Sequence, residues 1–251
     1  IYKAIRGGYR YFVQKKRSYI YSLYLKQIFN FYKTNFIKNA LIIYQPASFL
    51  LPLSHSWYKK DSLYERNRII ARVLMENKYN VDVISVFDKE FSPSIEYDLI
   101  FSNGSEYKRI YKSQLKKPKI ILHYTTAYYA FHNEQQEKRL YQYRVRTGLN
   151  FDIQRPEDLS NNGEFADRIL SMGNEFTKST FPKEINNKII MIPNFPIAHL
   201  NKIKKHVITE DTKKNFLYMA SKGSILKGLD LLMEVFSRPE MDKYNLYVSG
   251  S

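Results

Sequence analysis

The sequence predicts an α/β protein built on a parallel sheet, followed by the beginning of a second parallel sheet. Short apolar runs of strand length recur along the chain and alternate with helical or polar stretches. In the first part of the chain these runs are 40–44, 81–86, 97–102, 119–123, the start of 166–177, and 188–194. Such alternation is typical of β-α-β units, whose strands are parallel and buried. Two further runs flank a helical pattern and predict the second sheet: 216–220 and 244–250.

The composition narrows the class of protein. The chain has 251 residues, enough for one or two domains, and its 44% hydrophobic and 25% charged residues are typical of a globular protein. It contains no cysteine, which excludes disulfides and thiolate metal sites and is compatible with a reducing compartment. No run of about 18 apolar residues occurs, so we expect no membrane-spanning helix.

Residues 1–38 form a basic, aromatic N-terminal segment. They contain nine Lys or Arg and seven Tyr but no carboxylate, and the first acidic residue of the chain is Asp61. The formal net charge of the whole chain is +16. Cations mixed with aromatic rings suit the surface of an anionic membrane, and they also suit single-stranded nucleic acid. A general bias of the sequence toward Lys and Tyr explains the segment as well as a membrane does, and nucleic acid ranks below both.

The stretches around the strands carry helix and loop patterns. Residues 1–38 are predicted to be helical, with an apolar stripe through Ile20, Leu23, Ile28 and Phe31. The first strand is followed by a long loop, 47–60, and loops of this length are usually functional or mobile. The next helix is predicted to begin at Ser62, because Ser62 and Glu65 fit the capping box, and to run to about Lys78.

These patterns suggest a division into domains. Residues 140–165 are polar and are predicted to wrap the surface, whereas the Lys-rich stretch 199–214 fits an interdomain linker. We therefore expect one domain over 39–198 and the start of another over 215–251. Two strands and one helix are too few to bury a core, so the second domain is expected to be incomplete in this chain.

His123 is the first candidate for a functional residue. It stands at the carboxyl end of the predicted strand 119–123, where functional groups of parallel sheets gather. The alternative is a structural histidine, and the two interpretations are about equally supported. Asn133, Glu134 and Arg139 follow on a predicted helix, where His132 and Glu134 could equally form a helix-face pair without chemistry. No spacing along the chain is typical of metal ligands.

The second candidate is the loop between the strand at 216–220 and the helix that follows it. The loop carries Ser221, Gly223, Lys227 and Gly228, and the helix has an apolar face through Leu229, Leu232, Met233 and Phe236. A helix that begins after such a loop presents N–H groups and a positive dipole end to an anion, which suggests a phosphate site. The alternative is an ordinary strand-to-helix connection with a solvated lysine. The loop matches neither a P-loop nor Gly-x-Gly-x-x-Gly, which disfavours a dinucleotide-dependent dehydrogenase.

Four short motifs resemble one known family. They are Ala166-Asp167-x-Ile169, Gly173-Asn174-x-Phe176-Thr177, Ile192-Pro193-Asn194, and the run from Lys227 to Leu232. In this order, over roughly 39–251, they resemble the group 1 family of retaining, GT-B-fold glycosyltransferases in bacteria. The resemblance implies a Rossmann-like acceptor domain followed by a Rossmann-like nucleotide-sugar domain. It also implies that the chain is C-terminally truncated, since the paired glutamates of the family would lie beyond Ser251.

The resemblance further implies roles for the candidate residues. Lys227 would contact the diphosphate of the donor, with Gly223, Gly228 and Ser221 around it. His123 would be the catalytic candidate near the reacting centre, and Asn133, Glu134 and Arg139 would lie on the acceptor side. In the region of the phosphate cradle Ala220 and Lys222 depart from the family pattern, in which an arginine or a second glycine is common.

The expected function is therefore transfer of a sugar from a nucleotide-sugar to a cell-surface polysaccharide or a lipid-linked acceptor. The resemblance implies a hexosyltransferase-like reaction with retained configuration and without a metal or other cofactor, and leaves open whether the truncated chain is active by itself. We expect a cytoplasmic protein that attaches to the inner face of the membrane through residues 1–38, with no specific nucleic-acid partner. The alternative function is a non-catalytic basic module that binds nucleic acid or an acidic polymer.

Overall fold

The computed structural model of the chain describes residue 23 and residues 25–55, 62–158, 160–193, 207–219 and 223–249. Residues 1–22, Ser221 and the first half of the expected linker, 199–206, lie outside this part. The described residues fall into two compact units: a first unit drawn from Ile1–Ala127 and Ser160–Leu200, and a second drawn from Tyr128–Leu159 and Asn201–Ser251. The domain boundaries expected from the sequence stay a prediction.

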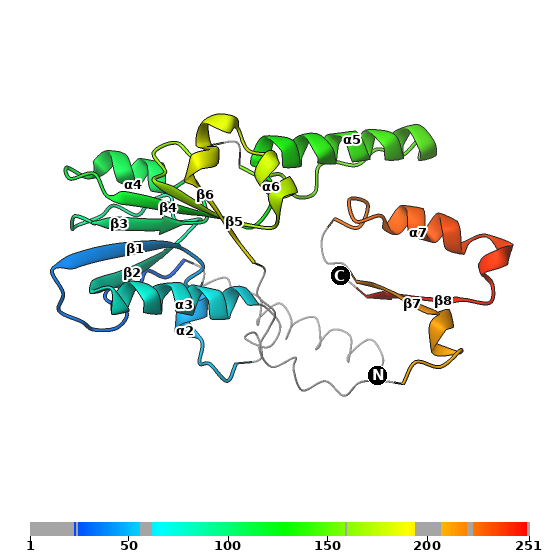
Figure 1. Ribbon diagram of the computed structural model, residues 1–251, viewed down its shortest axis with the longest axis horizontal. Coiled ribbons are helices and arrows are strands. Elements are labelled where there is room, and N and C mark those ends of the chain that lie inside the picture. Colours follow the sequence, from blue (N-terminus) through cyan, green and yellow to red (C-terminus); the bar gives the residue numbers. More distant parts are fainter. Residues whose placement is uncertain are drawn as a thin grey trace, which may run out of the picture. The chain divides into compact units, whose positions relative to one another are not determined.

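The first unit contains a six-stranded sheet (Figure 1). Its strands are β1 (Lys38–Tyr44), β2 (Tyr79–Ser85), β3 (Leu99–Ser102), β4 (Lys119–Tyr124), β5 (Arg168–Met172) and β6 (Ile189–Ile192). The order is β2-β1-β3-β4-β5-β6, and every neighbouring pair is parallel. The α/β class and the parallel sheet are thus confirmed. Because the chain moves outward in opposite directions from β1 and β3, the topological switch point lies between these two strands.

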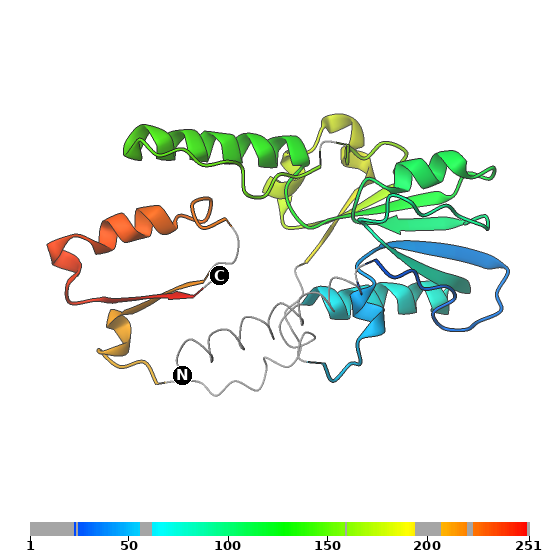
Figure 2. The same cartoon turned by 180° about the vertical axis from the view of Figure 1, so that it is seen from behind.

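Helices cover both faces of this sheet. They are α2 (Ala47–Leu50), α3 (Ser62–Glu76), α4 (Tyr107–Ser113) and α6 (Glu175–Ser179), with a 3-10 helix, η2, at Lys183–Lys188. In both views α3 lies against one face and α4 against the other (Figures 1 and 2). Ala71 and Leu74 of α3 pack on Ile42 and Val83 in the main core. The predicted start at Ser62 is confirmed. Contrary to expectation, the loop 47–60 begins with a helical turn, α2, which buries Phe49.

Residues 25–37 differ from the predicted helix. Ile28 exchanges two backbone hydrogen bonds with Val83 of β2, and the Phe31 N–H donates to the Val81 carbonyl at 2.9 Å. Asn30 and Lys33 have positive φ angles of 44° and 53°, which a helix does not tolerate. The segment therefore covers the outer edge of β2 instead of forming a helix. On the opposite edge, no strand in the described part of the chain pairs with the outer side of β6.

The second unit contains a long helix and a β-α-β element. Its elements are α5 (Tyr129–Thr147), a 3-10 helix η4 (Thr212–Lys214), β7 (Asn215–Met219), α7 (Leu229–Phe236), a 3-10 helix η5 (Pro239–Met241) and β8 (Asn245–Ser249). β7 and β8 are parallel, as predicted for the second sheet. Residues 140–147 are mostly exposed, in keeping with the prediction that 140–165 wrap the surface, but they are helical, because α5 continues to Thr147. It ends at Gly148, whose φ of 74° suits a glycine after a helix.

The two-stranded sheet has one covered face. Phe216 of β7 packs edge-on against Phe236 of α7, with ring centroids 5.5 Å apart. On the other face Leu217, Met219 and Tyr247 are more than half exposed. Among the described residues no helix is long and apolar enough to cross a membrane.

Candidate functional site

His123 lies inside the first unit, at the carboxyl edge of the sheet. It is the last but one residue of β4 and is only 1% exposed. Its Nδ1 lies 3.0 Å from the hydroxyl oxygen of Tyr44, the last residue of β1. The ring also lies beside Phe101 of β3, with centroids 5.9 Å apart. The three rings therefore span the switch point on one face of the sheet. His123 thus stands at the end of its strand, as predicted, but its side chain is part of the core.

The surroundings keep His123 neutral. Burial, with a smaller contribution from the positive charge of Arg66, lowers the pKa of His123 to about 4. The Nε2 atom is buried, and no described group makes a hydrogen bond to it. The contact with Tyr44 is compatible with the tautomer in which the tyrosine hydroxyl donates to Nδ1 and Nε2 carries the hydrogen. In that form Nε2 is an unused donor at the ligand-binding edge of a parallel sheet.

Arg66 and Asn67 of α3 are buried polar residues that sequence reasoning missed. Arg66 is 8% exposed and Asn67 is 1% exposed. One guanidinium nitrogen of Arg66 lies 3.0 Å from the sulfur of Met172, the last residue of β5. The signal in the sequence was their position three and four residues after Leu63, on the face of the helix that packs on the sheet. A charged or amide side chain at a core position is more informative than an exposed one.

The predicted acceptor-side residues all lie on α5. The Asn133 side chain is bonded both ways to the backbone of Glu157, at 3.0 and 2.9 Å, and so holds the segment that returns along the helix. Glu134 forms an exposed ion pair with Lys138. Arg139 donates to the Asp230 carboxylate of α7 at 2.5 Å. Structural contacts thus occupy all three side chains, and their role toward an acceptor stays a prediction.

The loop between β7 and α7 has the geometry expected of a strand-to-helix turn. Gly223 and Gly228 have φ angles of 87° and 80°, which a side chain would strain. Gly228 is the N-cap of α7 and provides no side-chain cap. Among the described residues nothing accepts a hydrogen bond from the N–H groups of Asp230 and Leu231. Lys227 is exposed, and within the same part of the chain its ammonium forms no ion pair.

Cationic side chains gather near the start of α7. Arg139 and Arg146 of α5 both bind the Asp230 carboxylate, and Arg146 also pairs with Glu234 at 3.1 Å. Burial raises the pKa of Asp230, but the hydrogen bonds and charges of the two arginines outweigh it and hold that pKa below its ordinary value. A Cβ at Gly223 would lie 3.4 Å from the Arg155 side chain. Within the described residues, the second unit therefore combines two helix N–H groups that lack an acceptor with several cations.

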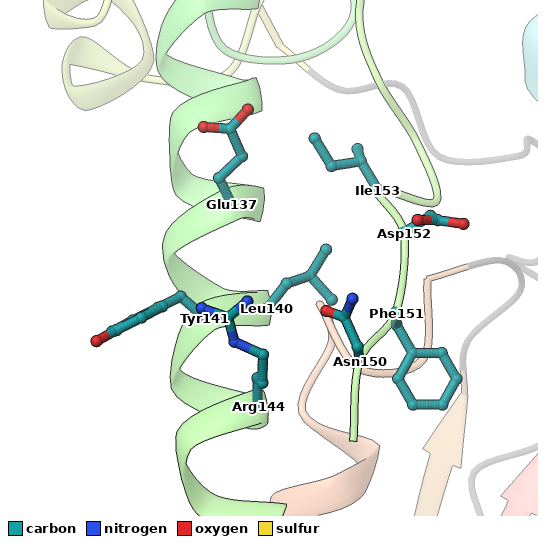
Figure 3. A pocket seen from close by; sticks show the side chains of 8 residues that line it. All are labelled: Glu137, Leu140, Tyr141, Arg144, Asn150, Phe151, Asp152 and Ile153. Carbon is teal, nitrogen blue, oxygen red and sulfur yellow. The ribbon is translucent and has the colours of Figure 1, made fainter. Parts of the chain in front are cut away.

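A shallow hollow of about 280 Å³ lies along α5 (Figure 3). Side chains of α5, including Glu137 and Arg144, form one wall. The chain segment 150–153 forms the other. None of the predicted site residues lines this hollow.

The structure thus brings some predicted residues together and separates others by unit. Arg139 meets the helix that follows the Lys227 loop, through Asp230, whereas His123 belongs to the first unit. Ser221 lies outside the described residues. No cluster of three or more His, Cys, Asp or Glu that could hold a metal ion occurs in the described ranges.

Comparison with known proteins finds no protein-family model, no curated protein and no solved structure that matches this chain. The resemblance to group 1 glycosyltransferases therefore stays a prediction.

Proposed function

We propose that the protein is a glycosyltransferase that takes a nucleotide diphosphate sugar as donor and holds the diphosphate at the β7–α7 turn. One observation carries the proposal: the carboxyl end of β7 leads, through a loop with two left-handed glycines, into α7, where the N–H groups of Asp230 and Leu231 and the ammonium of the adjacent Lys227 have no partner among the described residues. Such a helix start is a ready anion site. Two parts of the proposal are taken from the motif resemblance: that the donor is a nucleotide-sugar, and that the configuration at the anomeric carbon is retained.

The cations around α7 support an anion with more than one negative charge. Asp230 places a carboxylate in the first turn of α7, but Arg139 and Arg146 neutralise it. Lys227 and the helix dipole are then left to attract a diphosphate. In the reaction the bond from the anomeric carbon to the diphosphate breaks and a bond to an acceptor hydroxyl oxygen forms. The hydroxyl proton leaves with the phosphate or solvent, and Lys227 stabilises the charge that develops on the departing diphosphate.

Donor binding provides the first test. UDP and GDP, with uridine and guanosine as phosphate-free controls, are titrated into the protein by calorimetry. We expect a diphosphate to bind and its nucleoside to bind far more weakly. Lys227→Ala should weaken diphosphate binding by about tenfold or more, because a charge-assisted hydrogen bond is lost. Lys213→Ala is the matched control, since Lys213 belongs to the same unit but precedes the amino end of β7, opposite the loop.

Sugar release provides the second test. Hydrolysis or transfer from UDP- and GDP-sugars is measured for the longest available form of the protein, with Lys227→Ala beside it. The proposal fails if no diphosphate binds, or if the two lysine variants are indistinguishable. Tight oligonucleotide binding with a steep salt dependence, and no binding of nucleotide-sugars, would instead favour the basic binding module.

A further inference from the structure

Arg66 is a buried cation without a counter-charge among the described residues. Its side chain enters the first unit from α3, and the residue is 8% exposed. No carboxylate in the described part of the chain lies within ion-pair distance of it. Its guanidinium donates to the Met172 sulfur, a weak acceptor, and to the Ser62 hydroxyl at a long 3.4 Å. Its Nε has no partner within the same ranges.

Such an arrangement is energetically unfavourable unless something else supplies negative charge. A buried charge without a partner loses its hydration and gains nothing in return. The neighbouring arginine of the same helix shows the ordinary solution: Arg68 donates to the backbone carbonyls of Ser48, Phe49 and Leu51. Arg66 has no comparable set of acceptors in the described structure. The guanidinium is a planar fork of donors that matches the oxygens of phosphate or carboxylate.

The place of Arg66 in the fold also points to a ligand. Met172 ends β5, so the guanidinium lies at the carboxyl end of that strand, next to β4, with which β5 pairs. Ligands of open α/β sheets bind at this edge. The buried Nε2 of His123, at the end of β4, is a second polar atom without a described partner there, and the charge of Arg66 reaches it.

We infer that Arg66 is the anchor of an oxoanion site in the first unit, taking a phosphate group with the neutral imidazole of His123 as a second donor. The site is separate from the Lys227 loop and does not depend on it. One further step rests on the proposed function: under it, the phosphate would belong to the acceptor, as in a phosphorylated lipid or sugar.

The test is a titration of the intact protein with inorganic phosphate, followed by thermal unfolding and by the ¹⁵N shifts of histidine, with sodium chloride at equal ionic strength as reference. Phosphate should raise the Tm saturably and shift the His123 Nε2 resonance. Arg66→Met, which keeps the length of the side chain but removes the charge, should weaken the response by at least about tenfold. Without phosphate it should unfold at the same temperature as wild type or higher, because an uncompensated buried charge has been removed.

Two variants distinguish this site from the Lys227 loop and from a general loss of stability. Arg68→Met should lower the Tm, since three carbonyls lose a donor, but should leave the phosphate response intact. Lys227→Ala should also leave the His123 shift intact. The inference is overturned if wild type gives no saturable response, or if Arg66→Met unfolds well below wild type and keeps the response. A phosphate response that is lost in Lys227→Ala but kept in Arg66→Met overturns the inference too, and is compatible with the donor site at the Lys227 loop. Acetate replacing phosphate with equal effect would overturn the assignment to phosphate and indicate a carboxylate site.

Discussion

The imidazole of His123 is held in a core of rings, with Tyr44 on one side and Phe101 on another. A histidine in that position resists protonation, because the charged form would lose its hydration and would face the guanidinium of Arg66. The burial of His123 limits access to its side chain. It also couples the protonation of this side chain to the stability of the first unit.

We predict that His123 makes folding sensitive to acid. The folded-state pKa of about 4 lies below the ordinary value of 6.5, so between these two pH values the unfolded chain binds more protons than the folded one. The free energy of unfolding should therefore fall as the pH drops from about 6.5 to 4, by about 3 kcal/mol in total. Urea unfolding across this range measures it. His123→Gln should flatten this component, whereas His132→Gln, on α5, should not. Equal slopes for both variants would contradict the prediction.

Asp82 and Tyr97 form a second buried polar pair in the first unit. The Tyr97 hydroxyl donates to the Asp82 carboxylate at 2.7 Å, and the Asn30 N–H donates to the other carboxylate oxygen at 2.7 Å. Burial, then the hydrogen bond to Asp82, raises the pKa of Tyr97. The pair thus fixes the segment at Asn30 against β2.

Removing the Tyr97 hydroxyl should therefore destabilise the first unit. Tyr97→Phe leaves the Asp82 carboxylate with one donor fewer, which should lower the free energy of unfolding by about 1.5–3 kcal/mol, the range for hydrogen bonds to charged groups. Urea unfolding provides the measurement. Tyr141→Phe, at a position that is 59% exposed, is the matched control and should change little. A loss below about 0.5 kcal/mol for Tyr97→Phe would show that water replaces the hydroxyl.

Part of this residue-level picture could be predicted from the sequence. The strand pattern was enough to place His123 at a carboxyl edge, because strand ends are local features. The partners of Arg66 and His123 could not be predicted, since Met172 and Tyr44 are 106 and 79 positions away along the chain. Whether a polar side chain is buried depends on such distant contacts.

At the scale of elements, the turn between β5 and α6 depends on one glycine. Gly173 has a φ of 137°, and a Cβ there would lie 2.8 Å from the Cβ of Thr177 and closer still to its hydroxyl. Thr177 is also half of the capping box with Asn174, so it cannot move aside without loss of the cap. The Gly-Asn-x-Phe-Thr motif of the sequence is therefore a compact structural unit.

Gly173→Ala should consequently cost more than an ordinary glycine substitution. We expect about 2–4 kcal/mol in the free energy of unfolding, from backbone strain of about 1–3 kcal/mol plus the clash with Thr177. Gly148→Ala is the control, because it too has a positive φ but nothing within 4 Å of the new Cβ. Adding Thr177→Ala to Gly173→Ala should recover part of the loss. If the two glycine variants lose equal stability, the close approach is not limiting.

The elements that were predicted correctly have a local sequence pattern, whereas the conformation of segment 25–37 depends on distant contacts. Buried parallel strands are short apolar runs, and the strand predictions were confirmed. The end of α5 was missed although Arg144, Arg146 and Gly148 are typical of a helix C-terminus. The apolar spacing of segment 25–37 fits a helix, whereas pairing with β2 decides its conformation.

For the whole molecule, the uneven charge of the chain leads to a prediction about surfaces. Residues 1–38 carry nine cations and no acid, within a net charge of +16. We predict binding to vesicles that contain phosphatidylserine, weakening from low to physiological salt as screening increases. Replacing the cations at 15–17 by Gln should weaken binding by more than about tenfold, measured by co-sedimentation. The charge-matched control replaces Lys213, Lys214 and Lys243. An equal loss in the control would show that only net charge matters.

The function is the part of the picture that lies furthest from what the sequence can predict. A parallel sheet with polar groups at its carboxyl edge suits many chemistries, so the fold alone does not select one. The proposed function assigns a phosphate to the Lys227 loop, whose glycines and helix start form a local unit. Short motifs do not encode which base, sugar and acceptor such a function would use.

The two edge strands of the six-stranded sheet, β2 and β6, differ in whether their outer backbone groups are paired. This difference limits how two molecules could associate through the sheet. Backbone groups at residues 28–31 already occupy the outer side of β2, whereas within the described residues nothing pairs with the outer side of β6. An unpaired edge is a template for another chain. A two-fold pairing of β6 with its own copy would use up both free edges at once. Association through this sheet would therefore stop at a dimer and would not propagate into a fibre.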